Sequence, residues 1–224
     1  MVVLLHEVNK DETISYMKED TAPKGARPRQ QRAIETRASL LAAVETIVAE
    51  EGIQAVTTTR VASDTDVAVG TIYRYFADRD AMLLAAYDTT VARLIDTCHA
   101  ALENLQDGTP VEDAARHLLG VYLEAAEATP AHAGLLATMR LLRPIEVDRS
   151  STGDRVITDL VAPFFERFTR NAEVNPLQLQ LLGSTLGTMV DLYLVAPDDT
   201  DRALVRAETE AYLLFMIGRI VEER

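Results

Sequence analysis

The chain has 224 residues, a formal net charge of −13 and 48% hydrophobic residues, which is enough for one large domain or a small domain joined to a larger one. No apolar run approaches the roughly 18 residues that would span a bilayer, and the apolar start is too short for the core of a signal peptide. The single cysteine, Cys98, excludes an internal disulfide framework and a multi-cysteine zinc site. We therefore expect a soluble, cytoplasmic protein with no membrane segment and no cofactor.

The negative charge is unevenly distributed along the sequence. Between Lys24 and Arg79 there are eight bases and seven acids, whereas from Asp80 onward there are 12 bases and 23 acids. An acidic balance argues against general affinity for nucleic acid. A nearly neutral amino-terminal part can nevertheless approach an anion that the acidic remainder repels.

The first predicted helix follows a polar amino-terminal segment. Residues 1–30 hold Pro23, Gly25 and Pro28 close together, and we expect them to form a mobile arm. Gly52 stands where a left-handed cap would end the helix that follows. That helix, predicted over residues 36–51, has one apolar stripe at helical spacing, formed by Leu40, Leu41, Val44, Ile47 and Val48.

Two short helices are predicted next, over residues 58–65 and 69–76, joined by a turn at residues 66–68. Thr57 occupies the N-cap position of the first. Both helices have an apolar side, formed by Val61 and Ala62 in the first and by Ile72 and Phe76 in the second. Two short helices with a buried seam and a polar outer face indicate a helix-turn-helix.

The outer face of the second short helix carries groups suited to a sugar-phosphate backbone. Gly70 leaves room for close approach, Thr71 and the hydroxyls of Tyr73 and Tyr75 donate hydrogen bonds, and Arg74 carries charge. Such groups commonly contact DNA phosphates while the second helix enters the major groove. A solvated face with two partly packed tyrosines is the alternative.

The run from Thr36 to Asp88, which includes VAVGTIYRYFADRD, resembles the DNA-binding domain of the TetR (tetracycline-repressor) family of transcriptional regulators. The resemblance covers about a quarter of the chain. It implies a sequence-specific regulator of double-stranded DNA that works as a homodimer and is a repressor released from its operator by a small-molecule effector. Activation is the less common alternative in the family. The DNA-contacting positions that it implies are Thr58, Thr59, Arg60, Val69, Gly70, Thr71, Tyr73, Arg74, Tyr75 and Arg79.

Four positions depart from the family pattern. The turn has Asp66 in place of glycine, which aspartate tolerates better than most residues. Ala68 replaces a capping serine, a loss of about 0.5–2 kcal/mol unless another side chain reaches the free amides. Arg60 replaces an acid and opposes the helix dipole, although it would suit a phosphate. Val69 replaces a lysine and suggests an apolar contact with a thymine methyl group.

The arm from Lys24 to Arg32 could lie in a neighbouring minor groove, or it could be a tail that only aids solubility. We therefore expect three segments: the arm over 1–30, a DNA-binding domain over 31–80, and an effector-binding and dimerisation domain over 81–224.

The last of these segments is predicted to contain six helices, which gives an all-α fold of about nine helices. Asp80 is expected to cap the first of the six, and Pro163 to kink or split the fourth. Proline and glycine pairs mark several boundaries. The predicted spans are 80–105, 110–129, 131–142, 151–171, 176–196 and 200–222.

The last two helices are expected to form the dimer interface, because small residues at helical spacing let another helix approach closely. Ordinary intramolecular core is the alternative from the residues alone, and the family's dimerisation through its last two helices favours an interface. The interface residues expected are Gly183, Gly187, Ala211, Leu214, Phe215 and Gly218.

An effector cavity is implied by the resemblance alone, with plain core or surface as the alternative for each residue. Arg140 and Arg143 could bind a carboxylate or phosphate on an effector. The histidines of this part show no metal-like spacing. The candidate lining residues are Tyr122, Leu135, Met139, Arg140, Phe164, Phe165, Phe168 and Met189.

A helical enzyme and a helical interaction protein are the two alternatives to a regulator. A helical enzyme lacks support, because the sequence shows no nucleophile–base pair, metal motif or phosphate-binding loop. A helical interaction protein that has lost DNA reading is the other alternative, and Asp66 and Ala68 favour it slightly.

Overall fold

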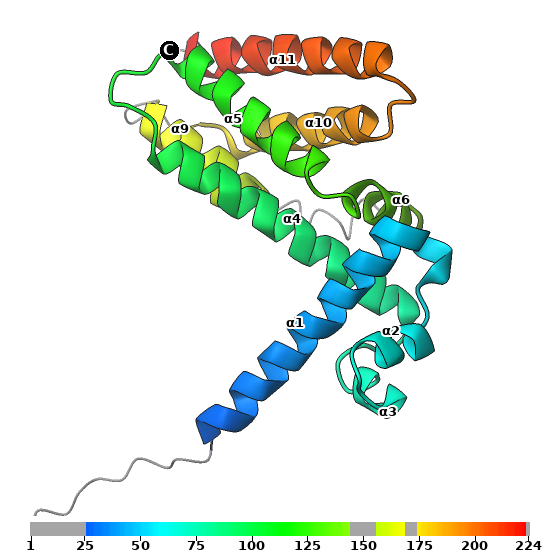
Figure 1. Ribbon diagram of the computed structural model, residues 1–224. Helices are drawn as coiled ribbons and strands as arrows, with labels where there is room; N and C mark the ends of the chain where they lie inside the picture. The colour runs from blue at the N-terminus through cyan, green and yellow to red at the C-terminus, as the bar shows by residue number, and fades with distance from the viewer. Residues whose placement is uncertain (1–25, 144–155, 169–173, 223–224) are drawn as a thin grey trace, which may run out of the picture. The chain divides into compact units, whose positions relative to one another are not determined.

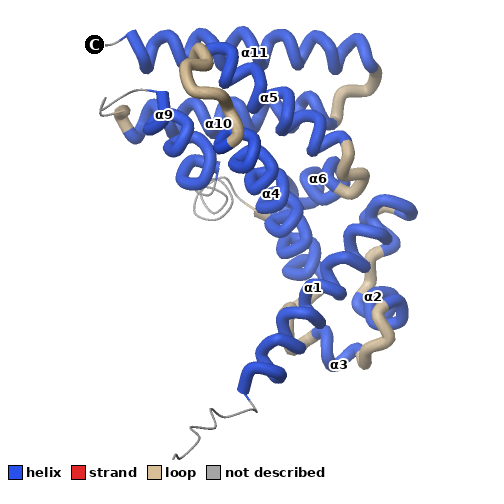
Figure 2. Tube along the Cα trace, turned by 60° about the vertical axis from the view of Figure 1, so that its left-hand side comes forward, coloured by secondary structure: helices blue, strands red, loops and turns tan. Residues whose placement is uncertain are grey.

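The computed structural model describes residues 26–143, 156–168 and 174–222, and all regular structure in these ranges is helical (Figures 1 and 2). This confirms the predicted all-α fold. In the described ranges, a 3-10 turn, η1 (Ile53–Ala55), and a π-helical turn, η2 (Ile157–Val161), accompany nine α-helices. The α-helices are α1 (Ala26–Glu51), α2 (Thr58–Asp64), α3 (Val69–Ile72), α4 (Arg79–Glu103), α5 (Val111–Glu127), α6 (His132–Leu142), α9 (Ala162–Phe168), α10 (Pro176–Leu194) and α11 (Asp199–Glu222).

The chain divides into two compact units, residues 1–36 and residues 37–224. In the first unit, α1 begins at Ala26, so the last residues of the predicted arm are helical. Arg, Gln and Ala are good helix formers, and Pro28 lies in the first turn, where a missing N–H loses no helical hydrogen bond. Residues 1–25, the rest of the predicted arm, lie outside the described residues.

The predicted end of the first helix is confirmed, as is the cap of the next, whereas the first helix starts at Ala26 and not at the predicted residue 36. Gly52 has a φ of 84°, and its N–H donates to the carbonyls of Ile47 and Val48, each at 3.1 Å. The Thr57 hydroxyl accepts the Arg60 N–H at 3.0 Å and caps α2. The predicted apolar stripe of α1 is buried along its whole length: Leu40, Leu41, Val44, Ile47 and Val48.

The helix predicted over residues 69–76 is shorter than expected. Helix α3 ends at Ile72, and the N–H groups of Tyr75 and Phe76 both donate to the Ile72 carbonyl, so the chain continues as turns. The preceding turn holds Asp66 at a φ of 53°, in the left-handed region that aspartate was expected to tolerate. Ala68, at the N-cap of α3, has no side-chain oxygen to cap this helix. Thr65 does not supply the missing cap, because its hydroxyl donates to the Val61 carbonyl.

Helix α4 is capped by Asp78 rather than by the predicted Asp80. Asp78 has an extended backbone, as an N-cap requires, and its carboxylate accepts the Ala81 N–H at 2.7 Å. Asp80 lies inside the first turn, where its negative charge still favours the positive end of the helix dipole.

A second core lies among α4, α5, α9, α10 and α11, with α10 and α11 side by side (Figure 1). Asn175 caps α10, and Asp198 accepts the N–H groups of Thr200 and Asp201 at the start of α11. The expected interruption near Pro163 takes the form of the π-helical turn η2, which directly precedes α9. A proline lacks the N–H needed by the regular ladder, and π turns commonly relieve such a defect.

Helix α6 packs tightly against both α1 and α4. A Cβ atom added at Gly134 would lie 2.9 Å from Val48 Cγ1, so only glycine allows this approach to α1. At the other end of α6, both terminal nitrogens of Arg143 donate to the carboxylate of Asp88 on α4, at 2.8 Å each. These contacts hold α6 in the amino-terminal core, which we define as the buried apolar residues of α1, α2, α3, the amino-terminal part of α4 and α6.

His132, at the start of α6, is a buried polar group in this core. Its side chain is 2% exposed, its ring lies 6.3 Å from that of Tyr87, and its Nδ1 has no hydrogen-bond partner among the described residues. Burial lowers the pKa of His132 to about 4. The folded protein therefore keeps this imidazole neutral at pH values where the unfolded chain protonates it.

We predict that His132→Leu reduces the loss of stability on mild acidification. The unfolded histidine protonates near pH 6.5 and the folded one near pH 4, so its contribution is intact above about pH 6.5 and lost as the pH falls towards 4. At pH 5 this difference in pKa lowers the free energy of unfolding of the wild type by about 2 kcal/mol. Urea unfolding of the wild type and the variant at pH 7.5 and pH 5 measures how much stability each loses. An equal loss of unfolding free energy in the two proteins would contradict the prediction.

Candidate functional site

The outer face of α3 is open, and its inner face is completely buried. Ile72 is 0% exposed, and Val61 and Ala62 of α2 pack beside it in the same core. Because the inner seam fixes the rotation of this short helix, Val69 and Gly70 face outward, and Tyr73 is 54% exposed. A Cβ added at Gly70 would meet nothing within 4 Å, so backbone can be approached closely there.

The other predicted residues of this face lie at its margin or beside it. Arg74 is exposed and makes no ion pair with any residue that the structure describes. Thr71 and Tyr75 are half-buried, and the ring of Tyr75 lies 6.4 Å from that of Phe76, against the core. We call Val69, Gly70, Thr71, Tyr73, Arg74 and Tyr75 the α3 face.

Arg79 differs from its predicted role as a phosphate contact. Its Nε donates to the Val56 carbonyl and its Nη2 to the Ile53 carbonyl, each at 2.6 Å. Its Nη1 contacts Asp80 at 3.3 Å. Arg79 thus ties the loop after α1 to the first turn of α4, and most of its donors serve the fold.

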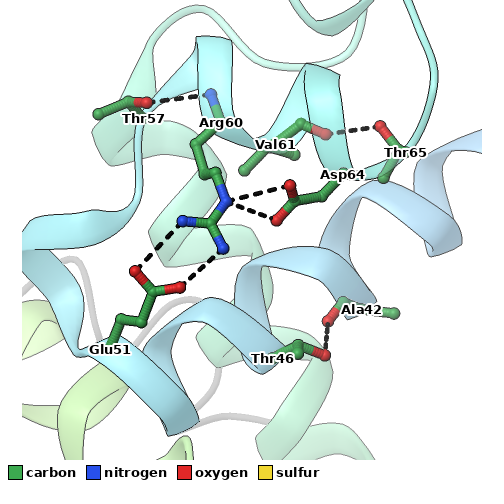
Figure 3. Close-up of polar contacts among 8 residues, drawn as sticks. All are labelled: Ala42, Thr46, Glu51, Thr57, Arg60, Val61, Asp64 and Thr65. Atoms are coloured by element: carbon green, nitrogen blue, oxygen red, sulfur yellow. Dashed lines mark hydrogen bonds and ion pairs between the residues drawn. The ribbon is translucent and has the colours of Figure 1, made fainter.

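Arg60 is likewise engaged within the protein (Figure 3). Its Nη2 lies 2.7 Å from Glu51 and its Nε 2.8 Å from Asp64, and the Arg60 guanidinium lowers the pKa of Glu51. Two carboxylates surround this one cation, so the local charge does not favour a phosphate. Of its predicted neighbours, Thr59 is exposed and Thr58 is half-buried. The i, i+4 spacing of Arg60 and Asp64 is a sequence signal for this pairing.

We predict that Arg79→Ala destabilises the protein and that Arg74→Ala does not. Removing the Arg79 guanidinium leaves two partly buried carbonyls without their donors, which costs about 1–3 kcal/mol. The exposed Arg74 should change the unfolding free energy by less than about 0.5 kcal/mol. Urea denaturation of the two variants gives the comparison, and equal midpoints would show that Arg79 has no structural role.

A cavity of about 350 Å³ lies among α4, α5, α6, η2, α9, α10 and α11. Tyr122, Arg140, Phe164 and Phe165 line it, as predicted for an effector pocket. The other four candidates do not. Leu135 and Met139 belong to the amino-terminal core, Phe168 packs against Phe164 with ring centroids 4.9 Å apart, and Met189 lies outside the lining.

The aliphatic part of the cavity lining was not predicted from the sequence. An aliphatic residue in an amphipathic helix has the same pattern whether it packs in a core or borders a cavity, so no sequence signal was available. The missed residues include Leu118, Leu119, Leu160, Val161, Leu186 and Val190.

Gly183 and Gly187, predicted at the dimer interface, line the cavity. A Cβ added at Gly183 would lie 3.2 Å from Cγ1 of Ile157, so its small size allows η2 to approach α10. The α11 residues predicted at the dimer interface are mostly accessible. Ala211 is exposed, Phe215 is 60% exposed, and Leu214 is half-buried. Gly218 has open space at its Cβ position.

Exposed apolar residues lie on α10 and on α11, two helices that pack against each other. Leu181 is 52% exposed, although it is a large apolar residue in the middle of an ordered helix. Within each helix the exposed positions recur at intervals of three, four, seven or eleven residues, which places them on one face of the helix and is a signal that the sequence contains. We define the apolar stripe as Leu177, Leu181, Leu192 and Val195 of α10 with Leu204, Ala211 and Phe215 of α11.

Among the residues that the structure describes, no three His, Cys, Asp or Glu side chains gather as a metal site. Within the same ranges, every helix is too short or too polar to cross a lipid bilayer.

Comparison with protein families places a known domain at the α3 face. The model of "Bacterial regulatory proteins, tetR family" matches residues 40–86, from the buried part of α1 into α4. A sequence search of curated proteins gives no significant match.

The fold is shared with solved structures of regulators. A TetR-family transcriptional regulator from Streptomyces coelicolor has a TM-score of 0.60 and 21% identity, covering 83% of this chain and 99% of its own. The TetR family repressor AlkX from Dietzia sp. strain DQ12-45-1b has a TM-score of 0.61 and 16% identity, covering 83% and 96%. FadR, a fatty acid degradation regulator from Bacillus halodurans, has a TM-score of 0.54 and 20% identity, covering 80% and 94%.

Proposed function

We propose that this protein, whose residues 40–86 match the TetR family and whose fold is that of TetR-family regulators, is a sequence-specific DNA-binding transcriptional regulator. The observation that carries this proposal is the α3 face: Tyr73 and Arg74 are exposed beside Gly70, while Ile72 beneath them is fully buried. Such a surface has hydrogen-bond donors, one unpaired cation and room for close contact. These are the properties that docking against duplex DNA requires.

In this proposal α3 enters the major groove and its flanks contact the backbone. The hydroxyls of Thr71, Tyr73 and Tyr75 donate to phosphate oxygens, and Arg74 supplies charge. Val69, exposed at the start of α3, faces the base edges, where its methyl groups suit a thymine. Arg60 and Arg79 act indirectly, by holding α2 and α4 in place.

A homodimer formed through the apolar stripe would present two α3 faces to one operator. Large exposed leucines and Phe215 on adjacent helices are unusual for a monomer, because contiguous apolar surface favours association. Two-fold symmetry would place the two recognition helices about 34–36 Å apart, or at a comparable multiple of the DNA repeat.

We further propose that the protein is a repressor and that an effector in the cavity releases it from DNA. Helix α6 supports this coupling, since Arg140 lines the cavity while Gly134 of the same helix contacts Val48 of α1. A ligand that favours one position of α6 would shift the population between DNA-competent and incompetent states. A coupling of about 1–3 kcal/mol is sufficient.

DNA binding is tested with a gel shift on the DNA that flanks the protein's own gene. We expect Tyr73→Ala to weaken binding by at least about tenfold, or 1.4 kcal/mol, because it removes an exposed donor from the α3 face. Tyr73→Phe, which keeps the ring, separates the hydroxyl's contribution from stacking, and circular dichroism confirms that both variants fold. An intact dimer that binds none of this DNA would favour the interaction protein that no longer reads DNA, and Tyr73→Ala with unchanged binding would show that Tyr73 of the α3 face is not a DNA contact.

Dimerisation is tested by placing charge in the apolar stripe. We expect Leu181→Glu and Phe215→Glu each to shift the protein towards monomer in analytical ultracentrifugation, because carboxylates resist desolvation at an apolar interface. Leu141→Glu is the matched control, since Leu141 is highly exposed on α6 and outside the stripe. A monomeric wild type, or a control as disruptive as the stripe variants, would contradict this interface.

A further inference from the structure

Tyr122 of α5 carries a hydroxyl group at a mainly apolar part of the cavity wall. This inference rests on the proposed function, because it takes the cavity as the effector site. Tyr122 lines the cavity and packs in a cluster with Leu123 of its own helix and with Val190 and Tyr193 of α10. Side chains from two helices therefore hold the Tyr122 ring at the wall.

The hydroxyl of Tyr122 is enclosed by the protein but has no hydrogen bond to any residue that the structure describes. Burial raises the pKa of this hydroxyl, with a smaller contribution from the Cys98 thiol, so the group stays protonated at neutral pH and can donate. Among the described residues, His132 Nδ1 alone is both fully buried and without a partner. The unpaired Tyr122 oxygen must therefore border open space, and the space that Tyr122 lines is the cavity.

Three other uncharged polar side chains of the lining form a row on α10, at intervals of four residues: Gln180, Ser184 and Thr188. Ser184 and Thr188 are exposed, Gln180 is half-buried, and the Thr188 hydroxyl already donates to the Ser184 carbonyl at 3.1 Å. Because water competes for accessible groups, a ligand gains little affinity from each of them. A donor enclosed by apolar side chains gains more from a partner, since the local dielectric is low.

We propose that the Tyr122 hydroxyl donates a hydrogen bond to the effector, and that the effector is a mainly apolar molecule with an oxygen acceptor at this point. A site with an enclosed donor discriminates against an analogue that lacks the acceptor, because that analogue leaves the donor unpaired. Apolar side chains dominate the rest of the described lining, and the volume of about 350 Å³ is usual for small-molecule sites. Tyr122 is thus a specificity-determining residue of the cavity.

The test uses two probes of nearly the same shape, acetophenone and ethylbenzene, which have a carbonyl and a methylene group, respectively, beside the ring. Calorimetric titration measures the binding of each probe to the full-length wild type and to Tyr122→Phe. Because ethylbenzene is the more apolar probe, each probe is compared between the two proteins. We expect Tyr122→Phe to weaken acetophenone binding at least about fivefold and not to weaken ethylbenzene binding. Unchanged acetophenone binding, or an equal loss for both probes, would overturn the proposal.

Tyr212→Phe is the matched control, because Tyr212 of α11 is half-buried and lies outside the cavity lining. It removes the same atom and should leave both affinities unchanged. Infrared spectroscopy of isotope-labelled acetophenone adds a readout in the wild type that requires no variant. A hydrogen bond to the bound ketone should lower its carbonyl stretching frequency below the value in hexane, and Tyr122→Phe should reverse this shift. An unshifted frequency in the wild type would show that no donor contacts the ketone and would overturn the proposal.

Failure of this inference is distinguishable from failure of the proposed function. If neither probe binds the wild type, the cavity takes no ligand of this class and the inference is wrong. DNA binding by the ligand-free wild type, measured by the gel shift, does not depend on the ligand and tests the regulator assignment alone.

Discussion

The packing of Ile72 against α2 and α1 is the contact on which the candidate DNA-binding surface depends. Helix α3 has only four residues, too few to be stable by its own hydrogen bonds, and no side chain of Ala68 caps it. Its position is determined by the burial of Ile72 and Phe76 in the core formed by Leu40, Val44 and Val61. Of the three side chains between these anchors, that of Tyr75 packs partly against the core and the other two face outward. Tyr73 and Arg74 are exposed for this reason.

Two arginines support this arrangement from outside the core. Arg79 donates to the carbonyls of Ile53 and Val56, which satisfies backbone acceptors in the turn between α1 and α2. Arg60 is held between Glu51 and Asp64, so it links the end of α1 to α2. Both are fixed cations close to the α3 face, yet their charge is balanced locally. The acidic protein therefore brings little unpaired positive charge to this surface, and shape and hydrogen bonding carry more of the proposed recognition.

Helix α6 connects the amino-terminal core with the cavity. Gly134 allows contact with Val48 at one end, and Arg143 is bound to Asp88 of α4 at the other. Arg140 lies between these points and pairs with Asp191 across the cavity lining. An event in the cavity that moved Arg140 would thus act on a helix already packed against α1 and α4. Because α6 contacts both the cavity and the core around α1, a shift of this one helix is a physical basis for coupling between the cavity and the α3 face.

The sequence by itself determined the helical class, the buried stripe of α1, the left-handed Gly52 and Asp66, and the cap at Thr57. These features depend on residues close together in the chain, and local spacing or local conformational preference decides them. The outward position of Gly70 and Tyr73 followed from the same periodicity. Pro28 misled the prediction of the helix start because a proline is equally acceptable in a first turn and in a loop.

Only the tertiary structure decided which partner each polar or small residue meets. Arg79 lies 23 and 26 residues from its two carbonyl acceptors, and Arg140 lies 51 residues from Asp191. Gly183 allows close packing against Ile157 of the same chain. Periodicity shows which residues are buried or share a helix face. It does not distinguish a core, a cavity wall and a subunit interface, because all three are made of the same apolar side chains and differ only in what lies opposite them.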